Sequence, residues 1–274
     1  MNLTKLLRFD ISSGISRNLF FVIPALSVPI LVVIEVLFAT RRPGIQLSFG
    51  DFILRAYGGM KPFDVNSGEP FIFPALWMLI FLPLFFALLN YPYNDLQSWG
   101  QQVILRTQSR SLWWWSKCGW NILACLIYHG ILLGILALGN LYGGGAWSMN
   151  LDANLIGKFF QVQSLRGSGS SLPIEFLFLP VLFSVAVCLF QMTLSMFCKP
   201  IFCFTIIAAL MIASAYVTHP IAIGNFAMLV RSDVVLAKGL SLHNGFLPLA
   251  AIIISSIIVG FIRFRRYDII NRED

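Results

Sequence analysis

Six long apolar stretches dominate the sequence and constrain what the chain can fold into. They lie at about residues 19–39, 70–90, 117–142, 174–198, 201–217 and 244–262. As helices, with a rise of about 1.5 Å per residue, these stretches can cross a hydrocarbon layer of roughly 30 Å. The sequence therefore predicts an all-α integral membrane protein in which residues 1–274 form a single transmembrane domain with six transmembrane helices.

The composition supports a membrane location. Hydrophobic residues make up 58% of the chain and charged residues 11%, with a mean hydropathy of +0.80. A water-soluble globular protein has about a quarter of its residues charged, so lipid is expected to contact much of this surface. The net charge of +7 resides in Lys and Arg at the ends of the apolar stretches. This distribution favours anchoring in a membrane over binding to nucleic acid.

The distribution of basic residues also predicts an orientation. With the N-terminus inside, the cytoplasmic segments hold eleven of the 19 Lys and Arg residues, in agreement with the excess of positive charge found in cytoplasmic loops. Both termini are therefore expected in the cytoplasm. The pair Lys199-Pro200 separates the fourth and fifth stretches. Because proline cannot continue a helix, this pair predicts a tight turn at the lipid headgroups and a helical hairpin.

Residues 1–18 precede the first span and carry their own pattern. Leu3, Leu7, Ile11 and Ile15 recur at a spacing of four, and polar side chains lie elsewhere. This pattern is typical of an amphipathic helix that lies in the membrane interface. A frayed, partly ordered tail is the alternative.

The segment 91–116, between the second and third spans, is longer and more polar than a simple turn requires. Leu96, Trp99 and Val103 fall at helical spacing. A short amphipathic helix would direct them, with Leu105, toward the membrane part of the protein. The polar residues Gln97, Gln101, Gln102 and Arg106 would face outward.

A basic and aromatic group follows this segment and consists of Arg110, Trp113, Trp114, Trp115 and Lys117. Tryptophan rings and long cationic side chains prefer the membrane–water interface, so these residues are predicted to anchor the third span there. The same pattern is typical of any helix that starts at the inner leaflet, and this simpler interpretation stays open.

With an N-terminal interfacial helix, six spans and the pattern Arg106, Arg110, Trp113, Trp114, Trp115 and Lys117, the chain resembles the permease subunits of ABC-type exporters, in the six-helix ABC-2-like or type V class. The resemblance covers nearly the whole chain as architecture. It implies a bacterial cell (inner) membrane location, a second permease chain and cytosolic ABC ATPase subunits. It also implies short re-entrant helices before the last span, a part that the stretches 220–230 and 234–242 could play. The implied ATPase-coupling helix consists of residues 94–106, with Asn94, Asp95, Leu96, Trp99, Gln102, Val103 and Arg106 as coupling residues.

Other chemistry is missing from the sequence. There is no G-x-x-x-x-G-K-[ST] phosphate-binding loop, so ATP and Mg are expected on a partner chain, with no cofactor and no enzymatic activity on this one. His129, His219 and His243 are scattered, and the five cysteines lie in or beside apolar stretches. Neither set has the spacing of a zinc site, and no disulfide framework is implied.

Two polar residues within the spans are candidates for a transport path or a substrate contact. Glu35 lies near the outer end of the first span, where Arg41 or Arg42 could reach it. It could bind a cationic group of the cargo, or it could simply extend to water. Gln191, in the fourth span, could form a hydrogen bond between helices.

These observations favour a permease subunit of an ATP-driven exporter that moves an amphipathic cargo such as a peptide, a lipid or a drug. A membrane-embedded enzyme would need a paired nucleophile and base, or clustered carboxylates, within the spans. A secondary carrier would need carboxylates in the membrane and internal repeats. The sequence offers few of the features that either class requires, and both classes remain as alternatives.

Overall fold

The computed structural model describes residues 3–17, 22–41, 45–64, 68, 70–96, 99–107, 109–162, 171–237 and 239–266. These residues form helices joined by loops, and they contain isolated β-bridges but no named strand. The prediction of an all-α protein is therefore confirmed. The α-helices are α1 (Leu3–Arg17), α2 (Val22–Ala39), α3 (Phe49–Tyr57), α4 (Ala75–Leu96), α5 (Trp99–Thr107), α6 (Arg110–Tyr142), α7 (Ala153–Phe160), α8 (Phe178–Leu194), α9 (Pro200–Tyr216) and α10 (Phe246–Arg265).

Five of the six predicted spans correspond to helical segments that are long and apolar enough to cross a membrane. These segments are Val22–Ala39, Ala75–Leu96, Arg110–Tyr142, Ile174–Leu194 and Leu242–Arg265. The remaining span corresponds to α9, an apolar helix of 17 residues. Helix α9 begins as predicted at the Lys199-Pro200 pair, with Pro200 in its first turn, where a proline needs no hydrogen-bond acceptor.

The helices whose bounds differ most from the prediction are α4 and α6. Helix α4 begins at Ala75, after Pro70 and Pro74, and continues to Leu96. Helix α6 begins at Arg110, where the Ser109 hydroxyl accepts a hydrogen bond from the backbone N–H of Leu112. The Trp-rich group therefore forms the first turns of α6 instead of a loop that precedes it.

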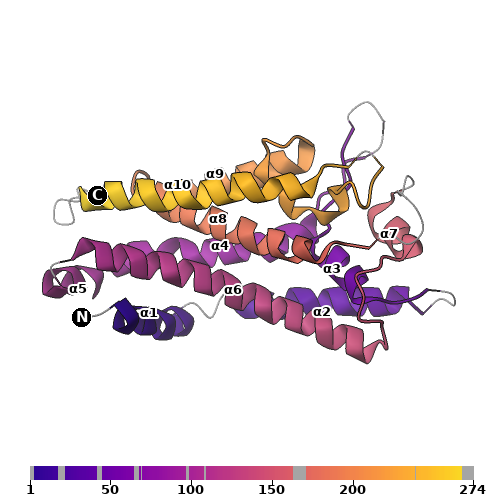
Figure 1. Ribbon diagram of the computed structural model, residues 1–274, viewed down its shortest axis with the longest axis horizontal. Coiled ribbons are helices and arrows are strands. Elements are labelled where there is room, and N and C mark those ends of the chain that lie inside the picture. Colours follow the sequence, from indigo (N-terminus) through magenta and orange to yellow (C-terminus); the bar gives the residue numbers. More distant parts are fainter. Residues whose placement is uncertain are drawn as a thin grey trace.

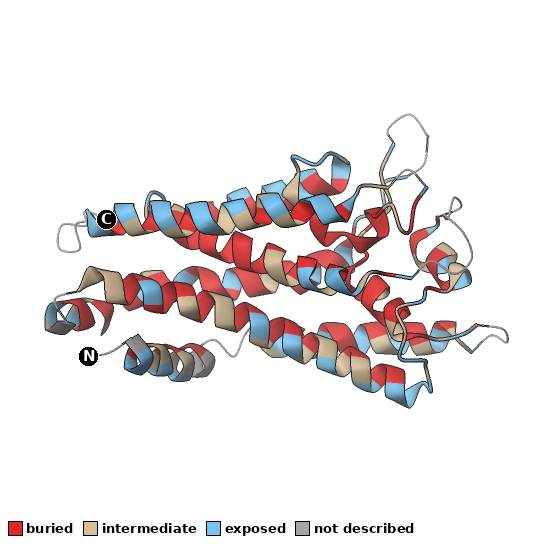
Figure 2. Ribbon diagram, viewed as in Figure 1, coloured by how far each residue is buried: buried red, intermediate tan, exposed pale blue. Residues whose placement is uncertain are grey.

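Helices α1 and α5 and the end of α10 lie at one end of the bundle, and α3 and α7 lie at the other (Figure 1). We call these the terminal end and the loop end. Helices α4 and α8 lie inside the bundle, and most of the residues in their spanning segments are buried. Pale blue, exposed residues dominate α10 (Figure 2).

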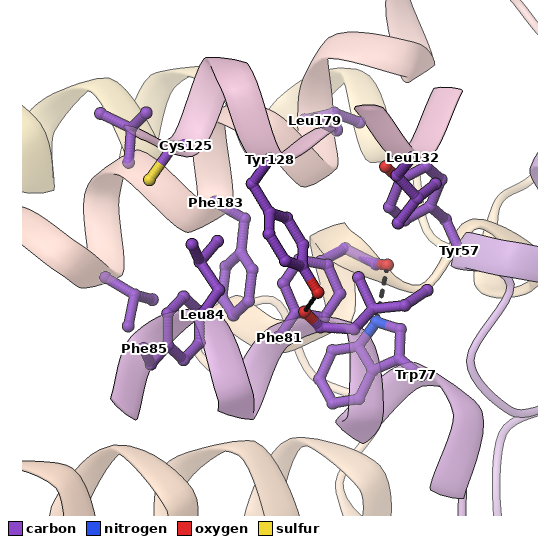
Figure 3. Close-up of a cluster of buried hydrophobic side chains, with 14 of the residues drawn as sticks. Tyr57, Trp77, Phe81, Leu84, Phe85, Cys125, Tyr128, Leu132, Leu179 and Phe183 are labelled. Carbon is purple, nitrogen blue, oxygen red and sulfur yellow. Dashed lines mark hydrogen bonds between the residues drawn. The ribbon is translucent and has the colours of Figure 1, made fainter. Parts of the chain in front are cut away.

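Aromatic side chains fill the middle of the bundle (Figure 3). The ring of Phe81 packs edge-on against Phe183, with 5.2 Å between centroids. The polar atoms of two other rings donate to backbone carbonyls. Trp77 Nε1 donates to Ala227 O at 2.9 Å, and Tyr128 Oη donates to Ile80 O at 2.7 Å. The buried indole of Trp77 and the buried phenol of Tyr128 thus keep their hydrogen bonds where water is excluded.

Large apolar side chains cover the outward faces of helices α2, α9 and α10. On α2 they are Ile23, Leu26, Ile30, Leu31, Ile34 and Phe38; on α9 they are Ile201, Phe202, Ile206, Leu210, Ile212 and Tyr216; on α10 they are Leu247, Ile254, Ile258, Val259 and Ile262. Exposed apolar surface of this extent is unfavourable in water. It is suited to contact with lipid or with another apolar helix.

The short helices α3 and α7 were not predicted, and both lie at the loop end. Ser48 and Asp51 form a capping box at the start of α3. Asp51 Oδ1 also accepts a hydrogen bond from the backbone N–H of Asp152 at 2.9 Å, and Asp152 caps α7. The Asp51 carboxylate thus joins the two helices. Burial raises its pKa to about 6, because desolvation disfavours the charged form.

A buried arginine holds the segment between α9 and α10. Arg231 is fully buried, and its guanidinium donates to Met60 O at 3.0 Å and to Ser214 O and Ala215 O at 2.7 Å each. It also donates to Asn225 Oδ1. Burial lowers the pKa of Arg231 to about 10, so the side chain stays protonated at neutral pH. Two of its acceptors are carbonyls at the C-terminal end of α9, where the helix dipole favours a cation.

We expect Arg231→Met to destabilise the protein by about 3 kcal/mol, because buried carbonyl acceptors at the end of α9 lose their donor. Thermal unfolding of the purified protein in detergent measures the effect. The exposed Arg41 provides the matched control, and Arg41→Met should change stability by less than about 0.5 kcal/mol. Equal effects of the two substitutions would contradict the anchoring role.

Stability should also depend on the ionisation of Asp51. Its pKa is raised on folding from 3.8 to about 6, so the stabilisation is fully present below about pH 4 and is lost as the pH rises through 6. The loss amounts to about 3 kcal/mol. Unfolding temperatures measured at several values between pH 4 and pH 7 should show a downward trend in the wild type that is weaker in Asp51→Asn. Parallel curves for the two proteins would exclude this assignment.

Candidate functional site

Three charged side chains lie buried together at the terminal end. Lys117 Nζ of α6 is 2.6 Å from Asp10 Oδ1 of α1 and 2.8 Å from Asp95 Oδ2 of α4. The side chains of Lys117 and Asp10 are each 2% exposed. We call Asp10, Asp95 and Lys117 the ion cluster. It joins three helices that are far apart in the sequence.

Neutral donors complete the ion cluster. The hydroxyls of Tyr91 and Ser116 donate to Asp10 at 2.9 Å and 2.5 Å, and Trp113 Nε1 donates to Asp95 Oδ2 at 2.9 Å. Two carboxylates face one ammonium, so the cluster carries a formal charge of minus one. Taking such charges out of water is costly unless each one is paired and hydrogen-bonded. These donors stabilise the excess negative charge.

The ion cluster changes the expected roles of two segments. Lys117 was predicted to extend to the interface, but its side chain is buried because two carboxylates bind it inside the bundle. Helix α1 was predicted to lie in the interface, and it packs against α6 through close contacts. A Cβ atom on Gly14 would clash with the ring of Trp120, and one on Gly119 would lie 2.8 Å from Leu7 Cδ2.

Helix α5 lies beside the ion cluster. A Cβ atom on Gly100 would lie 2.7 Å from Asp95 O and 2.8 Å from both Asp95 Oδ2 and Trp113 Nε1. Glycine therefore permits the start of α5 to approach the cluster closely. This contact couples the position of α5 to the buried charges.

The predicted coupling residues divide between the two faces of this region. Asp95 and Val103 are buried, Leu96 packs partly buried against the core, and Asn94 and Gln102 are exposed. The side chains of Trp99 and Arg106 lie outside the described residues. The inward orientation predicted for Leu105 is wrong, because this side chain is 75% exposed and Ile104 is buried instead. Helix α5 thus presents a leucine to the surroundings.

The tryptophans that were predicted to line the interface differ in burial. Trp113 is buried and stacks on Phe264, with 4.6 Å between ring centroids. Trp114 is buried, and its Nε1 donates to Ile257 O at 3.2 Å. Trp115 is exposed and suits the interface. The first two rings therefore pack the start of α6 against the end of α10.

Arg110 supports the same helix contact. Its Nη1 donates to Arg265 O at 3.0 Å, one of the last carbonyls of α10. An arginine at a helix C-terminus satisfies acceptors that the helix itself cannot. The basic residue therefore contributes to packing between α6 and α10 as well as to the charge of the terminal end.

The other two predicted site residues lie away from the ion cluster. Glu35 Oε2 pairs with Arg55 of α3, at 2.6 Å from Nη2 and 2.8 Å from Nε. The expected partner Arg41 instead lies over the ring of Phe38, and Arg42 is outside the described residues. Gln191 Nε2 donates to Phe85 O at 3.0 Å and so joins α8 to α4.

A buried polar network in the middle of the bundle was missed. Tyr57 Oη is 2.7 Å from His129 Nδ1, and His129 Nε2 is 2.8 Å from Ser184 Oγ. The Ser184 hydroxyl donates to Pro180 O. A histidine inside an apolar span was the sequence signal for such a network, but its partners come from helices distant in the sequence. The network joins α3, α6 and α8.

The described residues contain no group of three or more His, Cys, Asp or Glu side chains that could hold a metal ion. The ion cluster has its own cation in Lys117 and its hydrogen bonds come from side chains. Its chemistry is therefore that of a buried connection between helices. Its closeness to the exposed face of α5 makes the terminal end the candidate site for a partner.

The fold and these contacts define a multi-pass helical membrane protein. The chain belongs to the DUF2705 family, described as proteins of unknown function, and the match to the family model covers residues 28–270. No curated protein and no solved structure matches the chain.

Substitutions in the ion cluster should follow the charge balance. Lys117→Met leaves two buried carboxylates without a cation and should destabilise the protein by about 3–5 kcal/mol. Asp10→Asn leaves the oppositely charged pair of Lys117 and Asp95, so it should destabilise the protein less than Lys117→Met does. Thermal unfolding in detergent ranks the variants, with Lys5→Met on the exposed face of α1 as the control. A larger loss of stability in Asp10→Asn than in Lys117→Met would contradict the charge assignment.

Proposed function

We propose that the chain is the permease subunit of an ATP-driven exporter of the six-helix ABC-2-like class, moving an amphipathic cargo. Helix α9 would complete six spans, with both termini and α5 in the cytoplasm and the protein in a bacterial cell membrane. The exposed face of α5 carries the proposal. This short helix presents Gln102 and Leu105 to the surroundings and lies at the same end as α1 and the end of α10 (Figure 1).

An exposed leucine on a short polar helix suits a protein–protein contact. Interfaces bury an apolar centre within a polar rim, and Leu105 beside Gln102 offers both on a small scale. The adjoining residues Val103 and Ile104 are buried, so α5 is held against the bundle on its other face. These features support docking of a cytosolic ABC ATPase on α5.

The proposed mechanism is mechanical. Closure of the ATPase subunits would push on α5, and the contact of Gly100 with Asp95 would pass this displacement to the ion cluster. Because Lys117 binds Asp10 and Asp95, helices α1, α4 and α6 would move together. Rigid displacement of packed helices is a common basis of transport and switching. ATP and Mg would reside on the partner, since this sequence has no phosphate-binding loop.

A second permease chain is also proposed. One bundle of this size has little room for a transport path, and a path between two chains removes that restriction. The outward apolar faces of α2, α9 and α10 supply surface both for membrane lipid and for a second bundle. Nucleic acid is not a proposed partner.

The alternatives receive less support. A membrane-embedded enzyme could use the pair of His129 and Ser184, but the serine hydroxyl donates to Pro180 O, and both residues are buried. A nucleophile needs a base that accepts its proton and space for a substrate. A secondary carrier could use Glu35, but Arg55 neutralises the charge of this carboxylate, and the sequence offers no internal repeat.

Docking on α5 predicts the behaviour of Leu105→Asp. This substitution places a charge at the centre of the proposed contact, and we expect co-purification with the proposed ABC ATPase partner to fall at least about tenfold. The control is Ser12→Asp, which adds the same charge to an exposed position of α1 at the same end. Co-purification of Leu105→Asp at the wild-type level would remove α5 as the docking helix. ATP hydrolysis by the isolated chain would exclude the function itself.

A further inference from the structure

A cavity of about 390 Å³ lies at the loop end, between α2, the start of α4 and the segment after α3. Its walls are of two kinds. Val28 and Leu31 of α2, with Phe73 and Leu79 from the α4 side, form an apolar part. Glu35, Arg55, Lys61 and Asp64 form a charged part. A volume of this size with a few polar groups is typical of small-ligand sites.

The apolar part of the cavity opens toward the region that lipid would occupy. Leu31, Phe73 and Leu79 are each about half exposed, and Leu31 belongs to the outward apolar face of α2. Val28, Leu31 and Glu35 are spaced by three and four residues along one face of α2. From Val28 to Glu35 this face spans about 10 Å. The cavity therefore has an apolar end within the spanning segment and a charged end near the boundary.

The charged end still has hydrogen-bonding capacity. Both bonds from Arg55 go to Oε2 of Glu35, and within the described residues no bond is formed by Glu35 Oε1 or Arg55 Nη1. Arg55 is held in place by the ring of Phe159, at 4.7 Å from its centroid. A fixed carboxylate oxygen and a fixed guanidinium nitrogen thus adjoin the same cavity.

We propose that this cavity binds one zwitterionic phospholipid that carries a primary amine, with its headgroup against Glu35 and Arg55 and an acyl chain along Leu31. The phosphate would accept from Arg55 and the ammonium would donate to Glu35. The charged wall has two acidic and two basic side chains, and this balance favours a ligand with both signs over a purely anionic one. The proposal depends on the cavity alone and not on the partner ATPase.

Binding of phosphatidylethanolamine and phosphatidylglycerol with matched acyl chains, measured by native mass spectrometry of the full chain in detergent, tests this proposal. The wild type should retain one phosphatidylethanolamine and bind it at least about tenfold more tightly than phosphatidylglycerol. Phosphatidylglycerol has no ammonium, and the loss of one charge-assisted hydrogen bond corresponds to a difference in affinity of about this size. Glu35→Gln should abolish this preference, because it removes the negative charge that pairs with the ammonium. Equal binding of both lipids by the wild type would overturn the proposal.

A pair of tryptophan substitutions tests the place of binding. Leu31→Trp fills the apolar part of the cavity and should weaken phosphatidylethanolamine binding at least about tenfold. Ile34→Trp is the matched control, because Ile34 is similarly exposed on α2, at 56% against 51% for Leu31, and does not line the cavity. Both positions are exposed, so neither substitution should prevent folding. Unchanged binding by Leu31→Trp, or equal losses in both variants, would exclude this cavity as the site.

Soluble phosphoethanolamine separates a lipid site from a site for the free headgroup. At concentrations at which the lipid saturates the protein, we expect the soluble compound not to displace it, because the acyl chain supplies most of the contact area. Displacement at equal concentration would refute a site that requires an acyl chain. Because these measurements use the isolated chain, their failure is distinguishable from failure of the proposed transport function.

Discussion

The burial of Lys117 between Asp10 and Asp95 is the interaction on which the terminal end of the structure depends. An ammonium group in an apolar environment is stable only when it is paired, and here both partners come from other helices. The pairing fixes α1 against α6. It also fixes Asp95, beside which α5 begins. Charge pairing thus determines where the exposed helix lies.

Different interactions hold the bundle at different depths. At the terminal end they are ion pairs and the stacking of Trp113 on Phe264. In the middle they are aromatic packing and hydrogen bonds to backbone carbonyls, as for Trp77 and Tyr128 (Figure 3). At the loop end, caps and the guanidinium of Arg231 satisfy helix termini. Association of helices in lipid lacks a hydrophobic driving force between them, so close packing and such polar contacts carry it.

Much of the architecture could be predicted because hydropathy is a local property. The apolar stretches matched helices, and proline and serine account for the boundaries that shifted, at Pro74 and Ser109. Tertiary pairing could not be predicted. Lys117 lies at the end of an apolar stretch, which normally indicates an interface, and its partner Asp10 is far away in the sequence. Glu35 likewise pairs with Arg55 across α2 and α3, whereas proximity in sequence had favoured Arg41.

The orientation of α5 illustrates the same limit on a smaller scale. The helical pattern identified an amphipathic segment, but a helix of this length has few positions per face, and the observed burial of Ile104 in place of Leu105 corresponds to a rotation of about 100° around the helix axis. The rotation is set by Gly100, since any side chain there would collide with Asp95 and Trp113. The residue that α5 leaves exposed is therefore determined by a glycine contact to a buried carboxylate. For this reason the exposed face of α5 and the ion cluster beneath it form one unit, in which a change at either should alter the other.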